Sequence, residues 1–435
     1  MEMKKYKFID LLQPEKGIMK GPFGGDVKKE YFVPKASNTY KVYEQGVVYN
    51  KDYRIGNYYI SEERYNKLKR FEVKPKDILI SGAGTLGELY ELPNDIEPGI
   101  INQALIRIRI NEEIVNREFF KYYFKWYIKI VACQHIGASV IPNLPPLEDL
   151  KKIDVTLPSL EIQQKIAAVL SALNDKIALN RRMNAKLEQI AKRLYDHWFV
   201  QFDFPNADGK PYKSSGGKMV WNETLKHEIP EGWEVKKLGE LFTTNRGVSY
   251  STKTITGEIG IPMINLASFS PDGSYKIDGI KVYTGEYTQE KVLKPFDLVM
   301  CNTQQTAIDF SKDIIGKALL VPDIFEGDIT SSHHVNTLKV HNEKLKFYLY
   351  RLFNTDYFHA YISHYASGTN IMGLDFAGVE NYTAVIPGDE ILSKFADFTL
   401  NIEKKKSEII RENTKLISLR DRLLPLLMNG QVIVN

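Results

Sequence analysis

Two long segments of the chain carry a helical pattern of apolar residues. Their seam positions recur at alternating steps of four and three through 173–194 and again through 402–423. This spacing is the a/d seam of a coiled coil, and asparagines within it fix register at some cost in stability. We predict that two helices, each about 50 Å long at 1.5 Å per residue, pair with each other; the alternative is that each packs only on its own domain. The residues expected to pair are Leu173, Ile177, Asn184, Leu187, Leu194, Ile402, Ile409, Asn413, Leu416 and Leu423.

The segments before the two helices resemble each other in the same order. VKPKDILIS (73–81) matches LKPFDLVMC (293–301), and both contain Lys-Pro-x-Asp followed by an apolar run typical of a buried strand. Further on, GASVIPNL (137–144) matches GTNIMGLD (368–375), and NAKLEQIAKRL (184–194) matches NTKLISLRDRL (413–423). We therefore predict an α+β fold with an internal pseudo-twofold repeat. Each copy is a mixed α/β domain followed by a long helix, and the two helices form an antiparallel coiled coil.

A loop rich in Gly, Pro, Ser and Asn separates the two copies. An aromatic cluster precedes it, formed by Trp198, Phe199 and Phe202, and it is either a core anchor or a docking patch for another protein. The expected parts are a first domain at 1–158, its helix at 159–200, a linker at 201–230, a second domain at 231–388, and a second helix with the C-terminus at 389–430.

Composition limits the class of protein. The chain has 435 residues, of which 43% are hydrophobic and 26% charged, as in a soluble globular protein of two or three domains. It has no apolar run of about 20 residues, so we expect no membrane span, and we expect the cytoplasm because the N-terminus lacks a secretory signal. Cys133 and Cys301 lie in unrelated contexts and are expected to be reduced. A net charge of +4 permits DNA binding through a local patch.

The stretch DILISGAGTLGE (77–88) has glycines at the G-x-G-x-x-G spacing of a dinucleotide-binding turn. A nucleotide-dependent enzyme that uses 82–87 is therefore one alternative. It requires a helix after the glycines and an acidic residue about 20 positions later, where the chain has Pro93 and then a basic strand with Arg107 and Arg109. The second copy reads DLVMCNTQQTAI and lacks the glycines. A phosphate cradle cannot lose them all, whereas a loop that reads different hydrogen-bonding surfaces can change in this way.

The next matched segments carry amides and imidazoles just before a strand. INQALIRIRI (101–110) matches SSHHVNTLKV (331–340), so that Asn102 lies opposite Ser332 and Gln103 opposite His333. Such side chains, together with Arg and Lys, suit the edges of DNA bases. Ordinary loop divergence remains the alternative for any single residue. We expect no metal at His333 and His334, because no further ligand stands at suitable spacing.

Three stretches resemble the specificity subunits of type I restriction–modification systems. They are LPSLEIQQKIAAVLSALNDKIALNRRMNAKLEQIAKRLYDHWFVQFDFP (157–205), IPEGWEVKKLGELF (229–242) and LRDRLLPLLMNGQV (419–432). The resemblance implies two target-recognition domains, each reading one half of a split site in double-stranded DNA. It also implies that the chain catalyses nothing and binds two methyltransferase subunits and, through them, restriction (translocase) subunits. S-adenosylmethionine, ATP and Mg would belong to those partners. A stand-alone DNA-binding or scaffold protein is the other alternative.

The residues expected to meet DNA lie on loops of the two copies. In the first copy they are Lys20, Gly21, Ser81, Gly82, Thr85, Asn102, Gln103, Gly137 and Ser139. In the second they are Arg246, Gly247, Tyr250, Asn302, Thr303, Gln304, Gln305, Ser332, His333, Gly368, Thr369 and Asn370. Because the loops differ on a shared scaffold, we predict that the two half-sites differ and that the whole site is asymmetric.

Overall fold

Both long helices contribute residues to two units of the chain in this computed structural model. The first unit joins Met1–Ile177 to Lys415–Asn435, and the second is Ala178–Thr414. Each unit therefore has its own sheets and its own part of the helix pair. The structure describes residues 2–82, 88–134, 146–255, 259–305, 312–432 and 434.

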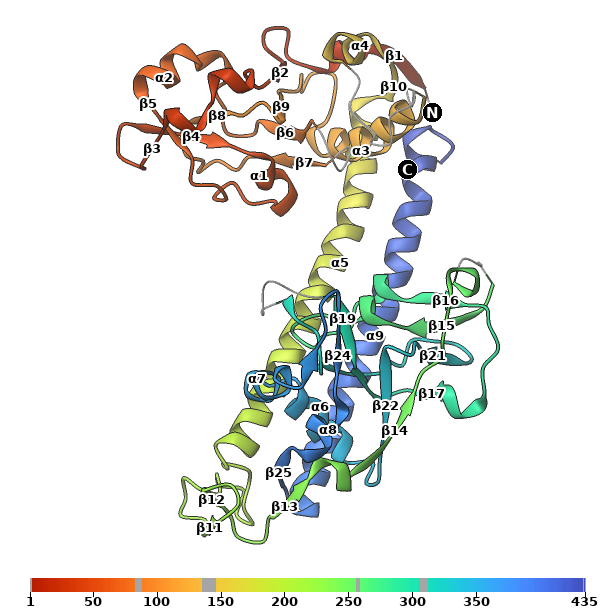
Figure 1. Cartoon of the computed structure of the whole chain (residues 1–435). Helices are drawn as coiled ribbons and strands as arrows, with labels where there is room; N and C mark the ends of the chain where they lie inside the picture. Colours follow the sequence, from red (N-terminus) through yellow and green to blue (C-terminus); the bar gives the residue numbers. More distant parts are fainter. Residues whose placement is uncertain are drawn as a thin grey trace. The chain divides into compact units, whose positions relative to one another are not determined.

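The first unit contains two four-stranded sheets and a two-stranded ladder (Figure 1). The first sheet has the order β2-β9-β6-β7 and is antiparallel, and all residues of β6 and β9 are buried. The second has the order β3-β5-β4-β8, in which β4 and β8 are parallel. The ladder pairs β1 with β10. The strands are β1 (Met3–Lys7), β2 (Ile18–Lys20), β3 (Phe32–Val33), β4 (Thr39–Tyr43), β5 (Tyr59–Ser61), β6 (Ile78–Ser81), β7 (Leu89–Glu91), β8 (Gly99–Ile101), β9 (Leu105–Ile108) and β10 (Asp154–Pro158).

Aromatic residues of helix α3 form much of the core of the first unit. Phe120 and Phe124 pack against Phe8, with ring centroids 6.3 and 6.1 Å away. Both long helices add apolar side chains to the same cluster, namely Ile166, Leu170, Leu427 and Met428. The helices of this unit are α1 (Gln45–Asn50), α2 (Glu62–Lys67), α3 (Arg117–Gln134), α4 (Leu147–Lys152) and parts of α5 (Leu160–Tyr195) and α9 (Asp389–Met428).

The second unit repeats this plan. An antiparallel sheet has the order β14-β22-β18-β20, and a second sheet, β16-β15-β21-β17, has one parallel pair, β15 with β21. Shorter sheets pair β13 with β25 and β11 with β12, and β24 pairs with both β19 and β23. The strands are β11 (Met219–Asn222), β12 (His227–Pro230), β13 (Glu234–Lys237), β14 (Phe242–Arg246), β15 (Ile261–Ile264), β16 (Lys281–Tyr283), β17 (Val292–Leu293), β18 (Leu298–Cys301), β19 (Thr303–Gln305), β20 (Ala318–Leu320), β21 (Ile329–Ser331), β22 (Val335–Val340), β23 (Ala366–Ser367), β24 (Ile371–Leu374) and β25 (Thr383–Ile386). The helices are α6 (Leu345–Phe353), α7 (Asp356–Ser363) and α8 (Phe376–Asn381), with the rest of α5 and α9.

The Lys-Pro-x-Asp segments form the same turn in both units. The carboxylate of Asp77 accepts a hydrogen bond from the Lys74 backbone N–H at 2.8 Å, and Asp297 accepts one from Lys294 at the same distance. The residue before each aspartate has a positive φ, 67° at Lys76 and 66° at Phe296. The apolar runs that follow become the buried strands β6 and β18. The predicted α+β fold with an internal repeat is confirmed.

Helices α5 and α9 run antiparallel to each other. In the second unit the Asn180 side-chain amide donates to Asn413 Oδ1 at 3.0 Å, and Lys406 Nζ donates to Glu188 at 2.7 Å, so the partners step in opposite directions along the two helices (Figure 1). In the first unit an Arg420 guanidinium N–H donates to Asn174 Oδ1 at 3.0 Å. The predicted antiparallel pair is confirmed, and Asn413 meets Asn180 in it.

The predicted seam residues lie on the inward sides of both helices. Four are buried: Ile177, Ile402, Ile409 and Asn413. The other six are half-buried: Leu173, Asn184, Leu187, Leu194, Leu416 and Leu423.

A buried group of charges joins helices α5, α6 and α9 in the second unit. Arg351 is 4% exposed and donates to the carboxylates of Glu188 and Glu403. Lys406 donates to the same two carboxylates, at 2.7 and 2.9 Å. Burial raises the pKa of Glu188, but Arg351 and Lys406 outweigh burial and lower this pKa to about 2. This ion network balances two cations against two anions, as buried charges require.

The segment predicted as a linker, 201–230, contains a hairpin that the sequence analysis did not predict. Strands β11 and β12 pair from Met219–Pro230 to Asn222–His227. Phe204 stacks on Tyr212 and Trp233, with ring centroids 4.6 and 4.8 Å away. Aromatic packing rather than an extensive sheet therefore holds this segment.

None of the helices in the described part of the chain has the length and apolar content needed to cross a membrane. Cys301 is a buried free thiol, and burial raises its pKa to about 12. The side chain of Cys133 lies outside the described residues.

Candidate functional site

Three segments that are distant in sequence meet in the first unit. The Gly21 N–H, just after β2, donates to the Leu105 carbonyl at 3.0 Å. The Gly82 N–H, just after β6, donates to the Ala104 carbonyl at 2.8 Å. The segment 102–105 is thus held from both sides by the residues that follow two strands. The predicted loops at Lys20–Gly21, Ser81–Gly82 and Asn102–Gln103 therefore form one site.

The second unit builds the same arrangement with other residues. The Gly247 N–H donates to the Val335 carbonyl at 3.3 Å, and the Asn302 N–H donates to the His334 carbonyl at 3.0 Å. These bonds match, position for position in the repeat, those made by Gly21 and Gly82. The scaffold therefore depends on backbone groups that both copies share.

Close backbone packing explains the glycine in each Lys/Arg-Gly pair. A Cβ atom on Gly21 would lie 1.8 Å from the Asn102 carbonyl oxygen. A Cβ on Gly247 would lie 2.2 Å from the carbonyl oxygen of Ser331. Neither distance is possible for real atoms, so Lys20 and Arg246, both exposed, precede a glycine that the fold requires.

Side chains of the first site differ in how far they reach solvent. Gln103 is exposed, and the Asn102 side chain accepts a hydrogen bond from the Ala104 N–H at 3.0 Å, which shapes the turn. Ser81 is buried, and its hydroxyl accepts from the Gln45 amide at 2.6 Å and lies 2.9 Å from the Tyr49 hydroxyl. Gln103 is the amide best placed to meet a base. Contact of Ser81 with DNA stays a prediction that its burial weighs against.

The basic strand after this turn faces inward, contrary to the expectation that it suits DNA. Arg107 is fully buried, and burial lowers its pKa to about 10. It donates to the backbone carbonyls of Glu72 and Lys16. Arg109 forms two hydrogen bonds with the Asp77 carboxylate, at 2.7 and 3.0 Å. Arg107 and Arg109 lie on β9, an inner strand of its sheet, and their guanidinium groups are occupied by hydrogen bonds within the protein.

Rings gather at the second site. The imidazoles of His333 and His334 lie 3.8 Å apart, and Tyr250 lies 5.4 Å from His333. The Lys281 ammonium is 5.4 Å from the Tyr250 ring, and the Thr303 hydroxyl is 2.7 Å from His334 Nδ1. Burial, with help from nearby cations, lowers the pKa of both histidines. The neutral rings can donate and accept hydrogen bonds, as base recognition needs.

Three polar residues predicted to meet DNA in this unit are buried instead. The Asn302 amide donates to Asn336 Oδ1 at 2.7 Å. Gln304 Oε1 accepts from the N–H groups of Ile314 and Ile315, at 2.7 and 3.1 Å. Ser332 is 0% exposed. The side chains of Asn302 and Gln304 hold the loop, at positions where the first copy has Gly82 and Gly84. Their contact with DNA stays a prediction that the burial weighs against.

The turn Gly368–Asn370 is exposed and belongs to the second site. It joins β23 to β24, which pairs with β19 through Thr303 and Gln305. Gly368 has a φ of 138°, a conformation that favours glycine. The side chain of Gln305 lies outside what the structure describes, as do Thr85, Gly137 and Ser139 of the first copy.

The nucleotide alternative finds little support in the described part of the glycine loop. Strand β7 begins at Leu89 and pairs with β6, where a dinucleotide fold has a helix. The Gly82 N–H already bonds to Ala104, so it cannot also bind a phosphate. Gly84 and Gly87 lie outside the described residues.

Two residues that lie in these candidate sites were not among those predicted from the sequence. The ring of His334 lies against that of His333 and hydrogen-bonds to Thr303, although its match in the first copy is only Ala104. Phe23 is 86% exposed and precedes Gly24, whose backbone lies against the Gln103 side chain. An apolar residue directly after Lys-Gly-Pro in a turn is the signal that could have identified Phe23.

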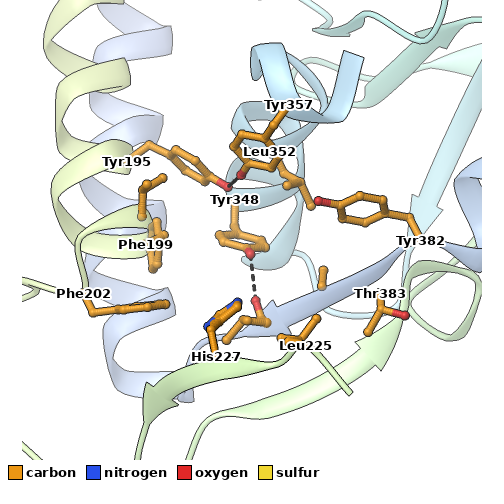
Figure 2. Close-up of a pocket in the computed structure, with 13 residues that line it drawn as sticks. Tyr195, Phe199, Phe202, Leu225, His227, Tyr348, Leu352, Tyr357, Tyr382 and Thr383 are labelled. Carbon is orange, nitrogen blue, oxygen red and sulfur yellow. Dashed lines mark hydrogen bonds between the residues drawn. The ribbon is translucent and has the colours of Figure 1, made fainter. Parts of the chain in front are cut away.

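A separate aromatic pocket with a volume of about 450 Å³ lies in the second unit. Figure 2 draws the residues that line it. The Tyr195 hydroxyl is 3.1 Å from that of Tyr357, and the Tyr348 hydroxyl donates to the Val385 carbonyl at 2.7 Å. Two predicted partner residues, Phe199 and Phe202, line the pocket and are themselves buried. Trp198 is half-buried and packs on Phe395. The core explains their packing, and their contact with a partner stays a prediction.

A comparison with known protein families identifies the family of this chain. The family model described as "Type I restriction modification DNA specificity domain" matches residues 24–189 and again residues 230–412. The chain therefore belongs to this family and contains two DNA-recognition domains.

Individual relatives agree. The type I restriction enzyme MjaIX specificity subunit of Methanocaldococcus jannaschii is 27% identical over 363 residues, or 82% of this chain and 77% of that protein. The HindI specificity subunit of Haemophilus influenzae is 24% identical over 424 residues, or 83% and 87% of the two chains. The fold is similar to the crystal structure of a type I S subunit from M. genitalium, with a TM-score of 0.53, 15% identity, and coverage of 98% and 96%.

Proposed function

We propose that the chain is the non-catalytic recognition subunit of a type I restriction–modification complex and reads a split, asymmetric DNA site. One observation carries this proposal. The two sites share backbone hydrogen bonds at Gly21 and Gly247 and at Gly82 and Asn302, yet they present different side chains. Two sites that share a scaffold but present different side chains can bind two different DNA sequences in a similar way.

Each site has side chains that can contact DNA phosphates and side chains that can read base edges. Lys20 and Arg246 are exposed cations that suit phosphates, and such contacts fix position without reading sequence. The Gln103 amide can form two hydrogen bonds with adenine, while neutral His333 and His334 offer single donors and acceptors. The first half-site is therefore expected to contain an adenine that the second does not share at the matching position.

The enzymatic steps belong to partners in this proposal. Two methyltransferase subunits bind the chain, carry S-adenosylmethionine and modify the site, while restriction subunits carry ATP and Mg. The host cytoplasm supplies both these partners and the DNA. The aromatic pocket is the proposed contact for an apolar side chain of one methyltransferase subunit, since Phe199 and Phe202 line it.

The test is purification of the full chain from its own cell, followed by selection of bound DNA from a random library. We expect a methyltransferase to copurify, and the selected sites to share two different short motifs with a fixed gap. A single continuous motif, or DNA binding without any methyltransferase, contradicts the proposal.

Filling the aromatic pocket tests the partner contact separately. Leu225 lines the pocket and is half-buried, so a Leu225→Trp variant should occupy its space. We expect less methyltransferase to copurify with it, with the selected DNA motifs unchanged. Val220→Trp, on an exposed residue of the nearby hairpin, is the matched control. Equal copurification with both variants contradicts the pocket contact.

A further inference from the structure

The ring of Phe23 stands out from the first site with almost no protein around it. It is 86% exposed, more than the other large exposed aromatic residues of the described chain, such as Trp221 at 57%. Aromatic side chains carry much apolar surface, and leaving it in water is unfavourable. Exposure alone identifies no ligand, but the residues around the Phe23 ring indicate one.

The loop that carries Phe23 is braced on both sides. Before it, the Gly21 N–H bonds to Leu105 at 3.0 Å and Pro22 is buried. After it, the Asp26 carbonyl accepts two hydrogen bonds from the Arg64 guanidinium, at 3.1 and 2.6 Å. Arg64 itself lies 4.0 Å from the Tyr31 ring. The ring is therefore presented by a fixed backbone, which lowers the entropy cost of using it to bind.

Phe23 directly precedes Gly24, whose backbone lies against a group expected to read DNA. A Cβ atom on Gly24 would be 2.8 Å from the side-chain oxygen of Gln103, so the loop touches that amide. Exposed Lys20 precedes the loop. A Cβ on Gly25 would meet nothing within 4 Å, so the loop presents little bulk beyond the ring. DNA bound by Lys20 and Gln103 would therefore meet Phe23.

We propose that Phe23 is a wedge that inserts its ring between two stacked base pairs of the first half-site. A contact with one thymine methyl group would bury only one edge of the ring. Insertion between bases would bury both faces of this exposed ring. Apolar side chains that enter DNA in this way partly unstack one step and kink the duplex. The inference deepens the proposed function, on which it rests.

The second copy supplies a natural comparison. Lys20-Gly21-Pro22-Phe23 matches Arg246-Gly247-Val248-Ser249, so a small polar residue takes the place of the ring. Ser249 is exposed but cannot separate two bases. The wedge therefore distorts the first half-site and leaves the second stacked.

The experiment uses the full chain with its copurified methyltransferase and the DNA site that the wild type selects. 2-Aminopurine is placed at successive positions, because its fluorescence rises where stacking is lost. We expect the wild type to raise fluorescence at one step in the first half-site and at none in the second. Phe23→Ser should remove that signal and weaken binding about tenfold, as loss of a stacked aromatic does. Phe23→Trp should keep it.

Controls separate the wedge from folding and from the proposed function. Trp221→Ala removes another exposed ring and should leave both fluorescence and affinity unchanged. Phe23→Ser should still select the wild-type second half-site, which shows that it is folded. If Phe23→Ser keeps the fluorescence rise and the affinity, the wedge is wrong while DNA recognition stands. If the wild type selects no DNA site at all, the proposed function and the wedge both fail.

Discussion

The two candidate sites share backbone hydrogen bonds and differ in the side chains of their loops. The first uses glycine at position 82 and leaves Gln103 and Phe23 exposed. The second replaces the glycine with Asn302 and braces its loop with buried amides, beside a half-buried cluster of rings around His333. Polar residues in a divergent loop are therefore poor guides to DNA contact, because the loop needs some of them to satisfy its own backbone.

The helix pair offers a second contrast. In the second unit Arg351, Glu188, Glu403 and Lys406 form a buried ion network, while in the first unit a half-buried Arg420 meets Asn174. Buried charges that lose one partner cost far more than half-exposed ones. We infer that the second unit depends more strongly on its part of the helices.

The largest expected effect follows from breaking that network. Arg351→Met leaves the buried carboxylate of Glu403 and the half-buried one of Glu188 with one cation, and should lower the free energy of unfolding by about 3–5 kcal/mol. Lys394→Met, which removes an exposed ion pair on the same helix α9, should cost less than about 0.5 kcal/mol. Urea unfolding at pH 7 compares them, and equal losses would contradict a structural role for the network.

Acid should weaken the same network in the wild type. The pKa of Glu188 falls from 4.5 to about 2 in the folded chain. A lowered folded pKa gives stability that is present above pH 4.5 and is lost as pH falls toward 2. Arg351→Met should therefore lose less stability than the wild type over this range. A steeper loss in the variant would be the opposite of what the network predicts.

Substituting Gly21 or Gly247, the glycines that the fold requires, should have an intermediate effect on stability and should affect only one of the two sites. Gly247→Ala should overpack the second site, cost about 1–3 kcal/mol and abolish selection of the second half-site only. Gly21→Ala should do the same to the first. Gly373→Ala and Gly25→Ala, where a Cβ meets nothing within 4 Å, are the matched controls. Library selection is the measurement, and loss of both motifs from one substitution would mean that the sites are not independent.

A shortened helix pair tests whether the two copies read DNA at a set distance. Asn174–Asn180 and the roughly opposite Thr414–Arg420 make up seven residues each, so deleting both keeps the seam in phase. If helix length sets the gap, removing about 10 Å should shorten it by about three base pairs and leave both motifs unchanged. Affinity should fall because the half-sites also rotate around the duplex. An unchanged gap in a folded variant means that the helices do not set the spacing.

The smallest effect on DNA binding is expected from the exposed cations Lys20 and Arg246, which occupy matching positions in the two copies. Lys20→Ala and Arg246→Ala should each weaken binding by a few-fold, lower the slope of log affinity against log salt by about 1, and leave the selected motifs unchanged. Filter binding over a series of salt concentrations measures this. A change of motif after either substitution would show base reading rather than phosphate contact.

The sequence predicted the repeat and the antiparallel helices because their signals are periodic. Seam residues such as Ile177 and Ile409 recur at fixed steps, and Lys-Pro-x-Asp marks the same turn twice. It could not separate exposed from buried polar residues in the loops. Gln304 and Gln103 are the same residue type, and only the fold shows that the first accepts two backbone N–H groups while the second is exposed. Arg107 was expected to suit DNA but is buried, because its strand lies inside the sheet, and the order of strands cannot be read from the sequence.

The most direct test of the account changes only the two half-buried imidazole rings of the second site. His333→Gln with His334→Ala gives it the residues that the first copy has at Gln103 and Ala104. Methylation-sensitive sequencing of the host genome then compares the modified motif of this variant with that of the wild type. The account predicts a split motif in which one half changes while the other half and the gap stay the same. A change in both halves, or in neither, would contradict the assignment of the two sites to two half-sites.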